Sequence, residues 1–203
     1  MSKVVVFTNL TLDGVMQAPG RPDEDRRGGF EHGGWASPYA AMSSTGKSMD
    51  NTSALLLGRR TYEDFYAFWP KQIGNPFTAM LDNMQKYVAS TTLSEPLSWS
   101  NSTLLPGDAA EAVAALKEEP GKDLLVMGSG ELIQSLMRHN LVDEYILLIH
   151  PLVLGSGRRL FADGGAFAAL RLVATSTTTT GVVIATYQPA IPEARKTTDA
   201  ATH

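Results

Sequence analysis

A glycine turn, Gly128-Ser129-Gly130, constrains this chain more than any other stretch, because it joins an apolar run to a segment with helical spacing. The run at residues 124–127 predicts a buried strand, and apolar residues repeat along one helical face from 131 to 139. In an open α/β sheet such a turn lies at the carboxyl end of a strand, where the amides of the next helix bind phosphate. The turn lacks the full dinucleotide motif, so nucleotide binding and a merely tight connection both stay open.

Short apolar runs alternate with helical segments along most of the chain. Strands are predicted at residues 3–9, 54–57, 87–90, 104–105, 124–127 and 145–149, and helices at 35–51, 59–69, 75–84, 108–119 and 131–139. Residues 170–175 and 182–187 alternate around a Thr/Gly turn and predict a hairpin. The pattern therefore predicts an α/β fold with three layers: a mostly parallel central sheet, flanking helices and an antiparallel C-terminal hairpin.

Length and composition favour one compact domain. The chain has 203 residues, 43% of them hydrophobic, and residues 1–188 are expected to form a single domain before a disordered tail at 189–203. A formal net charge of -4 without a basic stripe argues against nucleic acid and anionic membranes as partners. The chain has no cysteine, which excludes disulfides and thiolate metal sites and fits a cytoplasmic protein. No stretch reaches the roughly 20 apolar residues of a membrane span.

A long stretch rich in glycine, proline and charge, residues 10–34, follows the first strand. Loops of this length are unusual inside compact domains, and many of them close over active sites. A surface insertion is the alternative. We favour an active-site lid, because the strand before it should be central.

Three polar turns follow parallel-strand candidates: Gly58-Arg59-Arg60-Thr61, Ser90-Thr91-Thr92 and Gly128-Ser129-Gly130. All three should open onto the same edge of the sheet. Cations at the start of a helix oppose its dipole, so the two arginines make sense there if an anion binds. Arginines, hydroxyl groups and free amides together suit a dinucleotide with an extra phosphate, and NADPH is the predicted ligand.

In these features the chain resembles the dihydrofolate reductase-like family. Within that family it is most similar to the reductase domain of the bacterial bifunctional deaminase-reductase of riboflavin biosynthesis. The resemblance rests on Thr11-Leu12-Asp13-Gly14, on the three turns above and on the run from His150-Pro151 to Gly155-Ser156-Gly157. It implies a homodimer and a cofactor site. By resemblance, Gly58, Arg59, Arg60 and Thr61 hold phosphates, Ser90 and Thr91 the adenosine side, and Gly128, Ser129, Gly130, Glu131 and Leu132 the pyrophosphate and nicotinamide.

The chain departs from both branches of the family near the substrate. In folate reductases the segment after the lid resembles the pattern W-x-x-P-x-D/E. The corresponding segment of this chain is Trp35-Ala36-Ser37-Pro38-Tyr39-Ala40, which has alanine at the position of the acid. This argues against folate as the substrate. Riboflavin-type enzymes often follow Asp-Gly with a basic residue, where this chain has Val15. The acceptor is therefore left open.

Five residues remain as candidates to face a substrate. Asp13 is the candidate catalytic residue, either donating or orienting a proton, although Asp-Gly is equally an ordinary turn. Trp35 and Tyr39, one helical turn apart, could stack on a flat heterocycle, or belong to the core. Phe65 and His150 complete the set, with a packed role as the alternative for His150.

The sequence thus predicts an NADPH-dependent reductase that transfers a hydride to a small planar heterocycle, or to a conjugated imine or carbonyl. A binding protein of the same fold that has lost turnover is one alternative, and a flavin-binding protein is another. No metal is expected, because the four histidines show no ligand spacing.

Overall fold

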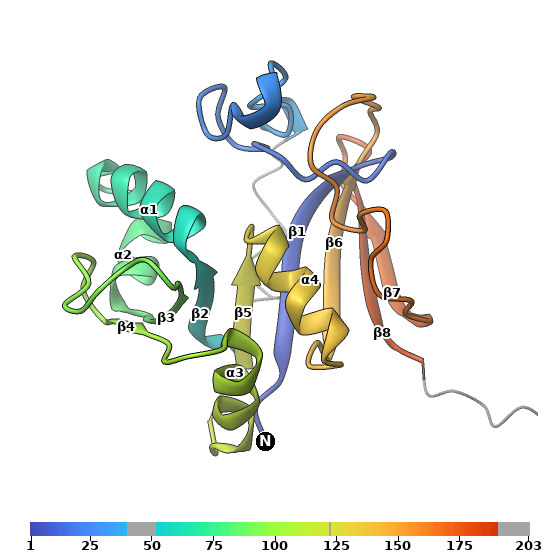
Figure 1. Ribbon diagram of the computed structural model, residues 1–203. Coiled ribbons are helices and arrows are strands. Elements are labelled where there is room, and N and C mark those ends of the chain that lie inside the picture. Colours follow the sequence, from blue (N-terminus) through green and yellow to red (C-terminus); the bar gives the residue numbers. More distant parts are fainter. Residues whose placement is uncertain (40–51, 122, 191–203) are drawn as a thin grey trace, which may run out of the picture.

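The computed structural model describes residues 1–39, 52–121 and 123–190, and its centre is an eight-stranded sheet (Figure 1). The strand order is β4-β3-β2-β5-β1-β6-β8-β7. The strands are β1 (Val4–Thr11), β2 (Thr52–Gly58), β3 (Gln85–Ala89), β4 (Ser102–Leu104), β5 (Asp123–Met127), β6 (Glu144–His150), β7 (Leu170–Thr177) and β8 (Val183–Pro189). The first six strands pair in parallel, whereas β8 runs antiparallel to β6 and β7 antiparallel to β8. The predicted fold class is confirmed.

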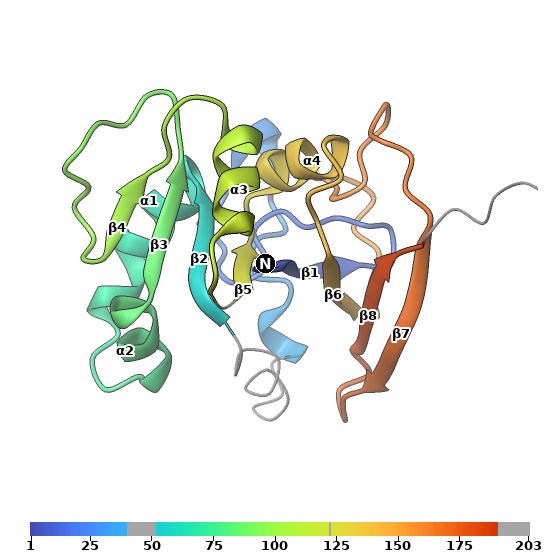
Figure 2. The ribbon, with the colours of Figure 1, turned by 90° about the horizontal axis from the view of Figure 1, so that it is seen from below.

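Helices cover both faces of the sheet, as Figure 2 shows. They are α1 (Arg59–Phe68), α2 (Pro76–Asn83), α3 (Ala109–Glu118) and α4 (Gly130–Arg138). Alternate residues of β1 separate the two cores: Val4 and Val6 pack with α3 and α4, while Val5 and Phe7 pack with α1 and α2. A strand buried on both faces must be apolar throughout, which explains the unbroken run at the start of the chain.

Two of the predicted segments reach the limits of the described residues. In the region predicted as helix 35–51, a short 3-10 helix spans Ser37–Tyr39, and residues 40–51, with Ala40, lie outside the described part. At the other end, β8 runs to Pro189, and residues 191–203 of the predicted tail also lie outside it. Among the described residues, no helix is both long and apolar enough to cross a bilayer.

Candidate active site

A cleft of about 1400 Å³ runs along the carboxyl edge of the parallel strands. It begins beside β3 and the loop before α3, passes the ends of β2 and β5, and reaches Phe7, Thr8 and Asn9 of β1. Every residue predicted to bind the cofactor lines this cleft: Gly58, Arg59, Arg60, Thr61, Ser90, Thr91, Gly128, Ser129, Gly130, Glu131 and Leu132. The three turns therefore open onto one space, as expected for strands that end at the same edge.

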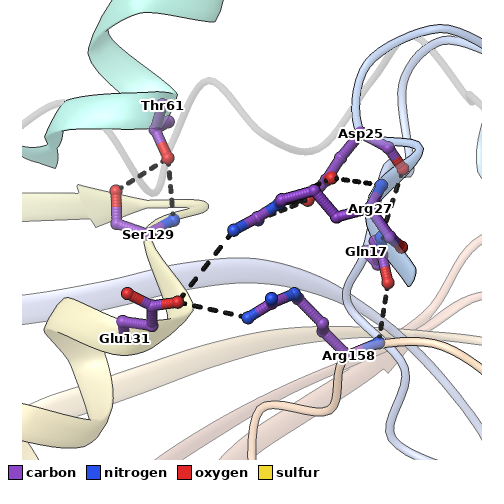
Figure 3. Close-up of polar contacts among 7 residues, drawn as sticks. All are labelled: Gln17, Asp25, Arg27, Thr61, Ser129, Glu131 and Arg158. Carbon is purple, nitrogen blue, oxygen red and sulfur yellow. Dashed lines mark hydrogen bonds and ion pairs between the residues drawn. The ribbon is translucent and has the colours of Figure 1, made fainter.

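The turns after β2 and β5 are joined through Ser129. Its backbone nitrogen donates to Thr61 Oγ1 at 3.0 Å (Figure 3), and its own Oγ accepts from Gly58 N at 3.0 Å. Ser129 adopts a left-handed conformation with φ of 50°, and a Cβ added to Gly128 would lie 3.1 Å from Thr61 Cγ2. Glycine is favoured at position 128 by its φ of 57° and by the close approach of the two turns, whatever the cleft binds.

The helices that begin at these turns leave their first amides free of side-chain caps. Asn75 and Asp108 cap α2 and α3, but neither α1 nor α4 has a side-chain cap. The first amides of a helix need an acceptor from a side chain, water or a ligand. Because both uncapped ends line the cleft, they form a cradle for an anion.

Two arginines add positive charge to this cradle. Arg59 lies 3.6 Å from Glu63, an exposed pair on one face of α1. Arg60 is exposed, and the described residues include no acid within ion-pair distance of it. The donors at the start of α1 and α4 therefore fit the phosphates of a dinucleotide such as NADPH.

The hydroxyl of Ser90 organises the loop after β3. Its Oγ accepts from Thr92 N at 3.1 Å and from Leu93 N at 3.0 Å. This turn shapes the far end of the cleft, with Thr91 beside it.

The predicted lid is a packed loop organised around Gln17, which is buried. Gln17 Nε2 donates to the carbonyl oxygens of Asp25 and Arg27, at 3.2 and 3.0 Å, and its Oε1 accepts from Arg158 N at 2.9 Å (Figure 3). Met16 N donates to Arg158 O at 2.8 Å, so the loop after β6 holds the lid in place. Met16, Gln17 and Ala18 line the cleft, which places the lid over the site.

Charged side chains meet at the lid side of the cleft. Glu131, in the first turn of α4, lies 3.1 Å from Arg158 Nη1 and 4.0 Å from Arg27 Nη1 (Figure 3). Glu131 is 80% exposed, so these pairs contribute little to stability. Arg27 is also paired with Asp25. The arrangement leaves two guanidinium groups beside the uncapped end of α4.

A second acidic group lies deeper in the lid. Glu24 accepts from Gly20 N at 2.7 Å and from Arg21 N at 3.1 Å, and Arg21 forms an ion pair with Asp64 of α1. Burial raises the pKa of the Glu24 carboxyl, and the nearby charge of Asp64 adds to the effect. Burial also raises the pKa of Asp64, against the opposing effect of Arg21. Both acids line the cleft, so it contains carboxyl groups with an increased tendency to hold a proton.

Asp13 does not line the cleft. Its carboxylate accepts from Thr11 Oγ1, from Leu154 N at 3.2 Å and from Gly155 N at 2.8 Å, and it lies 3.6 Å from Arg159 Nη2. The hydrogen bond from Thr11 and those from the two amides lower its pKa to about 2. The geometry favours the turn interpretation, because the ionised carboxylate anchors the loop after β6.

The aromatic candidates separate into two groups. Phe65 lines the cleft, whereas Trp35 and Tyr39 pack edge-to-face on His150, with ring centroids 5.2 and 5.4 Å away. Trp35 Nε1 donates to Gln17 O at 2.7 Å, so this ring supports the lid. His150 is buried and bonds to Asn9, which does line the cleft.

Sequence reasoning missed Asn9, Gln17, Glu24 and Arg27, which all line the cleft. The sequence did contain a sign that Asn9 is exposed to the cleft, since it is the one amide side chain in an otherwise buried strand. It contained no comparable sign for the three lid residues, because their positions depend on how an irregular loop packs. No group of three His, Asp or Glu side chains within the described ranges is arranged to hold a metal ion.

Comparison with known proteins shows the family to which this chain belongs. The family model of the RibD C-terminal domain matches residues 2–184. The chain belongs to this family. The uncharacterized protein YyaP of Bacillus subtilis (strain 168) is 34% identical over 191 residues, which cover 91% of this chain and 94% of that protein. The expected relationship to riboflavin-type reductases is thereby confirmed.

Solved structures show the same fold. The crystal structure of a putative riboflavin biosynthesis protein from Shewanella sp. PV-4 has a TM-score of 0.71 and 21% identity, with 94% of this chain and 100% of that chain covered. Dihydrofolate reductase from Enterococcus faecalis, solved in complex with NADP(H), has a TM-score of 0.55 and 13% identity, with 92% and 96% covered. The RibD C-terminal domain of this chain thus has a dihydrofolate reductase-like fold.

Proposed function

We propose that this protein is an NADPH-dependent reductase that transfers a hydride to a small planar heterocycle, or to a conjugated imine or carbonyl. Membership of the RibD C-terminal domain family supports a reductase-type function. The observation that carries the proposal is the pair of uncapped helix ends, α1 and α4, with Arg59 and Arg60 beside them in one cleft. That donor set suits a pyrophosphate and a further phosphate.

The strand order supports one direction for the proposed dinucleotide along the cleft. Ser90 and Thr91 at the end of β3 face the adenosine, and the turns after β2 and β5 hold the phosphates. The next strand is β1, so the nicotinamide reaches the level of Thr8 and Asn9, under Met16 and Gln17 of the lid. The lid excludes water from this end, which protects the hydride during transfer.

NADPH supplies the hydride, and the protein supplies orientation and a proton. Phe65 and Met16 give the acceptor end apolar walls. Reduction of an imine or carbonyl adds hydride to carbon and a proton to nitrogen or oxygen. We assign that proton to Glu24, which lines the cleft with a raised pKa and is reprotonated from water, because Asp13 is ionised and outside the cleft.

Two other functions fit the same cleft. A nucleotide-binding protein without turnover would keep the cradle and lose the acceptor, and a flavin protein would use the cleft for an isoalloxazine ring. A yellow purified protein would support the flavin function. Binding of NADPH without any acceptor would support the binding protein.

We further propose a homodimer that forms through β7. This strand ends the sheet, and among the described residues no strand pairs with its outer edge. Leu172 and Val173 are 50% and 45% exposed, so a second copy would bury apolar side chains as well as the edge. Sedimentation of the wild type and of Val173→Lys tests this, with a dimer expected only for the wild type.

The cofactor is tested by titrating NADPH and NADH while following the fluorescence of the three tryptophans. Wild type should bind NADPH more tightly, and the double variant Arg59→Ala, Arg60→Ala should lose that preference. Arg138→Ala, an exposed arginine in the last turn of α4 and outside the cleft lining, is the control. Failure of the wild type to bind either nucleotide contradicts the proposal.

A further inference from the structure

Asn9 and His150 lie at the carboxyl ends of two neighbouring strands, β1 and β6, on one face of the sheet. Asn9 is the only residue of β1 that is not buried, and it lines the cleft beside Phe7 and Thr8. Phe7 pairs in register with Met127 of β5, so Asn9 stands level with the phosphate turn that follows Met127. A ring held next to that turn would meet the side chain of Asn9.

The hydrogen bond between the two side chains fixes their orientation. His150 Nε2 lies 2.9 Å from Asn9 Oδ1, and an amide oxygen only accepts, so Nε2 carries the hydrogen. Burial lowers the pKa of His150, which favours the neutral ring with a single N–H. Nδ1 is then bare, which agrees with its surroundings: it is buried, and no described residue bonds to it. A buried lone pair without a partner is tolerated better than a buried N–H without one.

This pairing leaves the other half of the Asn9 amide for the cleft. Oδ1 is occupied by His150, and no described residue accepts from Nδ2. Asn9 is half-buried and lines the cleft, so the amide group left over from the pairing lies on the cleft side. His150 itself does not line the cleft, and Trp35 and Tyr39 hold its ring by edge-to-face packing.

We propose that the Asn9 amide donates a hydrogen bond to a carbonyl oxygen on the ring that lies at this end of the cleft, and that His150 is its positioning residue. The carbonyl belongs either to the carboxamide of nicotinamide or to the acceptor ring. The inference rests on the proposed function. Such a contact would make the cleft selective between rings, since a fixed N–H donor favours a ring with a carbonyl over one with an amino group in the same place.

The first experiment reads the tautomer directly, whether or not a nucleotide binds. The nitrogen NMR spectrum of His150, assigned from His150→Gln, should show a protonated Nε2 and a bare Nδ1. The opposite tautomer would make Nε2 an acceptor and turn the Asn9 oxygen toward the cleft. That result overturns the inference.

The second experiment compares NADPH with 2′-phospho-ADP-ribose, which lacks the nicotinamide, and adds uracil to the NADP⁺-loaded protein as a probe with ring carbonyls. Asn9→Asp replaces the donor with an acceptor of the same shape. It should weaken one of the two ring probes about tenfold while 2′-phospho-ADP-ribose binds as before. A loss for NADPH identifies the carboxamide, and a loss for uracil identifies the acceptor ring.

Matched variants separate positioning from damage. Asn140→Asp adds the same charge at an exposed position outside the cleft lining and should leave both ring probes unchanged. His150→Gln keeps an N–H donor and should retain most of the affinity, whereas His150→Leu should match Asn9→Asp. If Asn9→Asp behaves like Asn140→Asp with both probes, Asn9 has no such role. Loss of all nucleotide binding in the wild type would instead refute the proposed function.

Discussion

Thr61 Oγ1 lies 3.0 Å from both the backbone nitrogen and the Oγ of Ser129, and this contact joins the N-terminus of α1 to that of α4. The two residues are 68 positions apart in the sequence. Because neither helix has a side-chain cap, the contact aligns two sets of free amides on the same part of the cleft. The relationship makes Thr61 a structural part of the proposed phosphate cradle as well as a lining residue.

Thr61→Val should therefore disrupt the cradle. Valine keeps the shape but leaves the amide of Ser129 without its acceptor, which costs about 1–3 kcal/mol in the free energy of unfolding. We expect NADPH to bind about tenfold more weakly, since the two helix ends lose their alignment. Thr61→Ser keeps the hydroxyl and should behave like the wild type in urea unfolding and NADPH titration. Equal affinity in both variants would contradict the shared cradle.

Glu131→Gln should strengthen NADPH binding. The carboxylate of Glu131 stands in the first turn of α4 and attracts Arg27 and Arg158, two cations that a phosphate would otherwise recruit. Removing an exposed charge there should raise the affinity about threefold, with a steeper dependence on salt, because the site gains one net positive charge. Glu118→Gln, an exposed glutamate in the last turn of α3, is the control in the same calorimetric titration. A lower affinity in Glu131→Gln would place the phosphates elsewhere.

Glu24→Gln should slow hydride transfer while NADPH binds normally. The raised pKa of Glu24 comes mainly from burial, and the active form of a proton donor is the protonated one. The wild-type rate should thus fall as pH rises through that pKa, and Glu24→Gln should be slower by about 10²–10⁴ with no such fall. Stopped-flow oxidation of bound NADPH measures both the rate of hydride transfer and its dependence on pH. An unchanged pH profile in the variant would remove Glu24 from the reaction.

Lys86 should make stability depend on alkaline pH. Its side chain is fully buried, donates to Met84 O at 2.7 Å and lies 4.5 Å from the centre of the Trp99 ring. Burial lowers its pKa from 10.5 to about 8, so the folded state releases the proton first and stability rises with pH between these values. The rise is at most about 3 kcal/mol. Urea unfolding of Lys86→Met should lack it, and a parallel rise in the variant would contradict the assignment.

Asp13→Asn distinguishes an anchor from a catalyst. The folded pKa of about 2 lies below the usual aspartate value of 3.8, so the carboxylate stabilises the fold above pH 3.8 and that contribution disappears as pH falls toward 2. The variant should lack this acid-dependent loss in thermal unfolding, because asparagine does not ionise. NADPH affinity should remain close to that of the wild type, and the pH profile of hydride transfer should keep its shape. A changed profile would restore Asp13 as a catalytic residue.

The regular elements could be predicted from the sequence because their burial is local in origin. Residues 54–57 and 124–127 are apolar on both faces, and they lie within β2 and β5 as observed. Asp108 caps α3 through Ala110 N and Glu111 N, which agrees with the capping pattern that predicted this helix. The insertion of β5 between β2 and β1 could not be predicted, since strand order depends on long crossovers.

The candidate site was predictable mainly where it follows a strand. The glycine and hydroxyl turns line one cleft because parallel strands end at one edge. The position of Glu24 in the cleft lining has a different origin. The amides of Gly20 and Arg21 donate to its carboxylate, and Arg21 forms an ion pair with Asp64. Asp13 carries the family motif, yet its neighbours are the amides of Leu154 and Gly155, which lie far away in the sequence.

The most direct test of the central claim follows the hydride itself. The protein is incubated with NADPH deuterated at the transferred position and with a small-molecule extract, and the products are examined by mass spectrometry. We expect a compound that gains one deuterium from the cofactor and one proton from water, and the same compound should gain no deuterium with Glu24→Gln over the same time. Tight binding of NADPH with no labelled product in any extract would contradict a reductase and leave a nucleotide-binding protein.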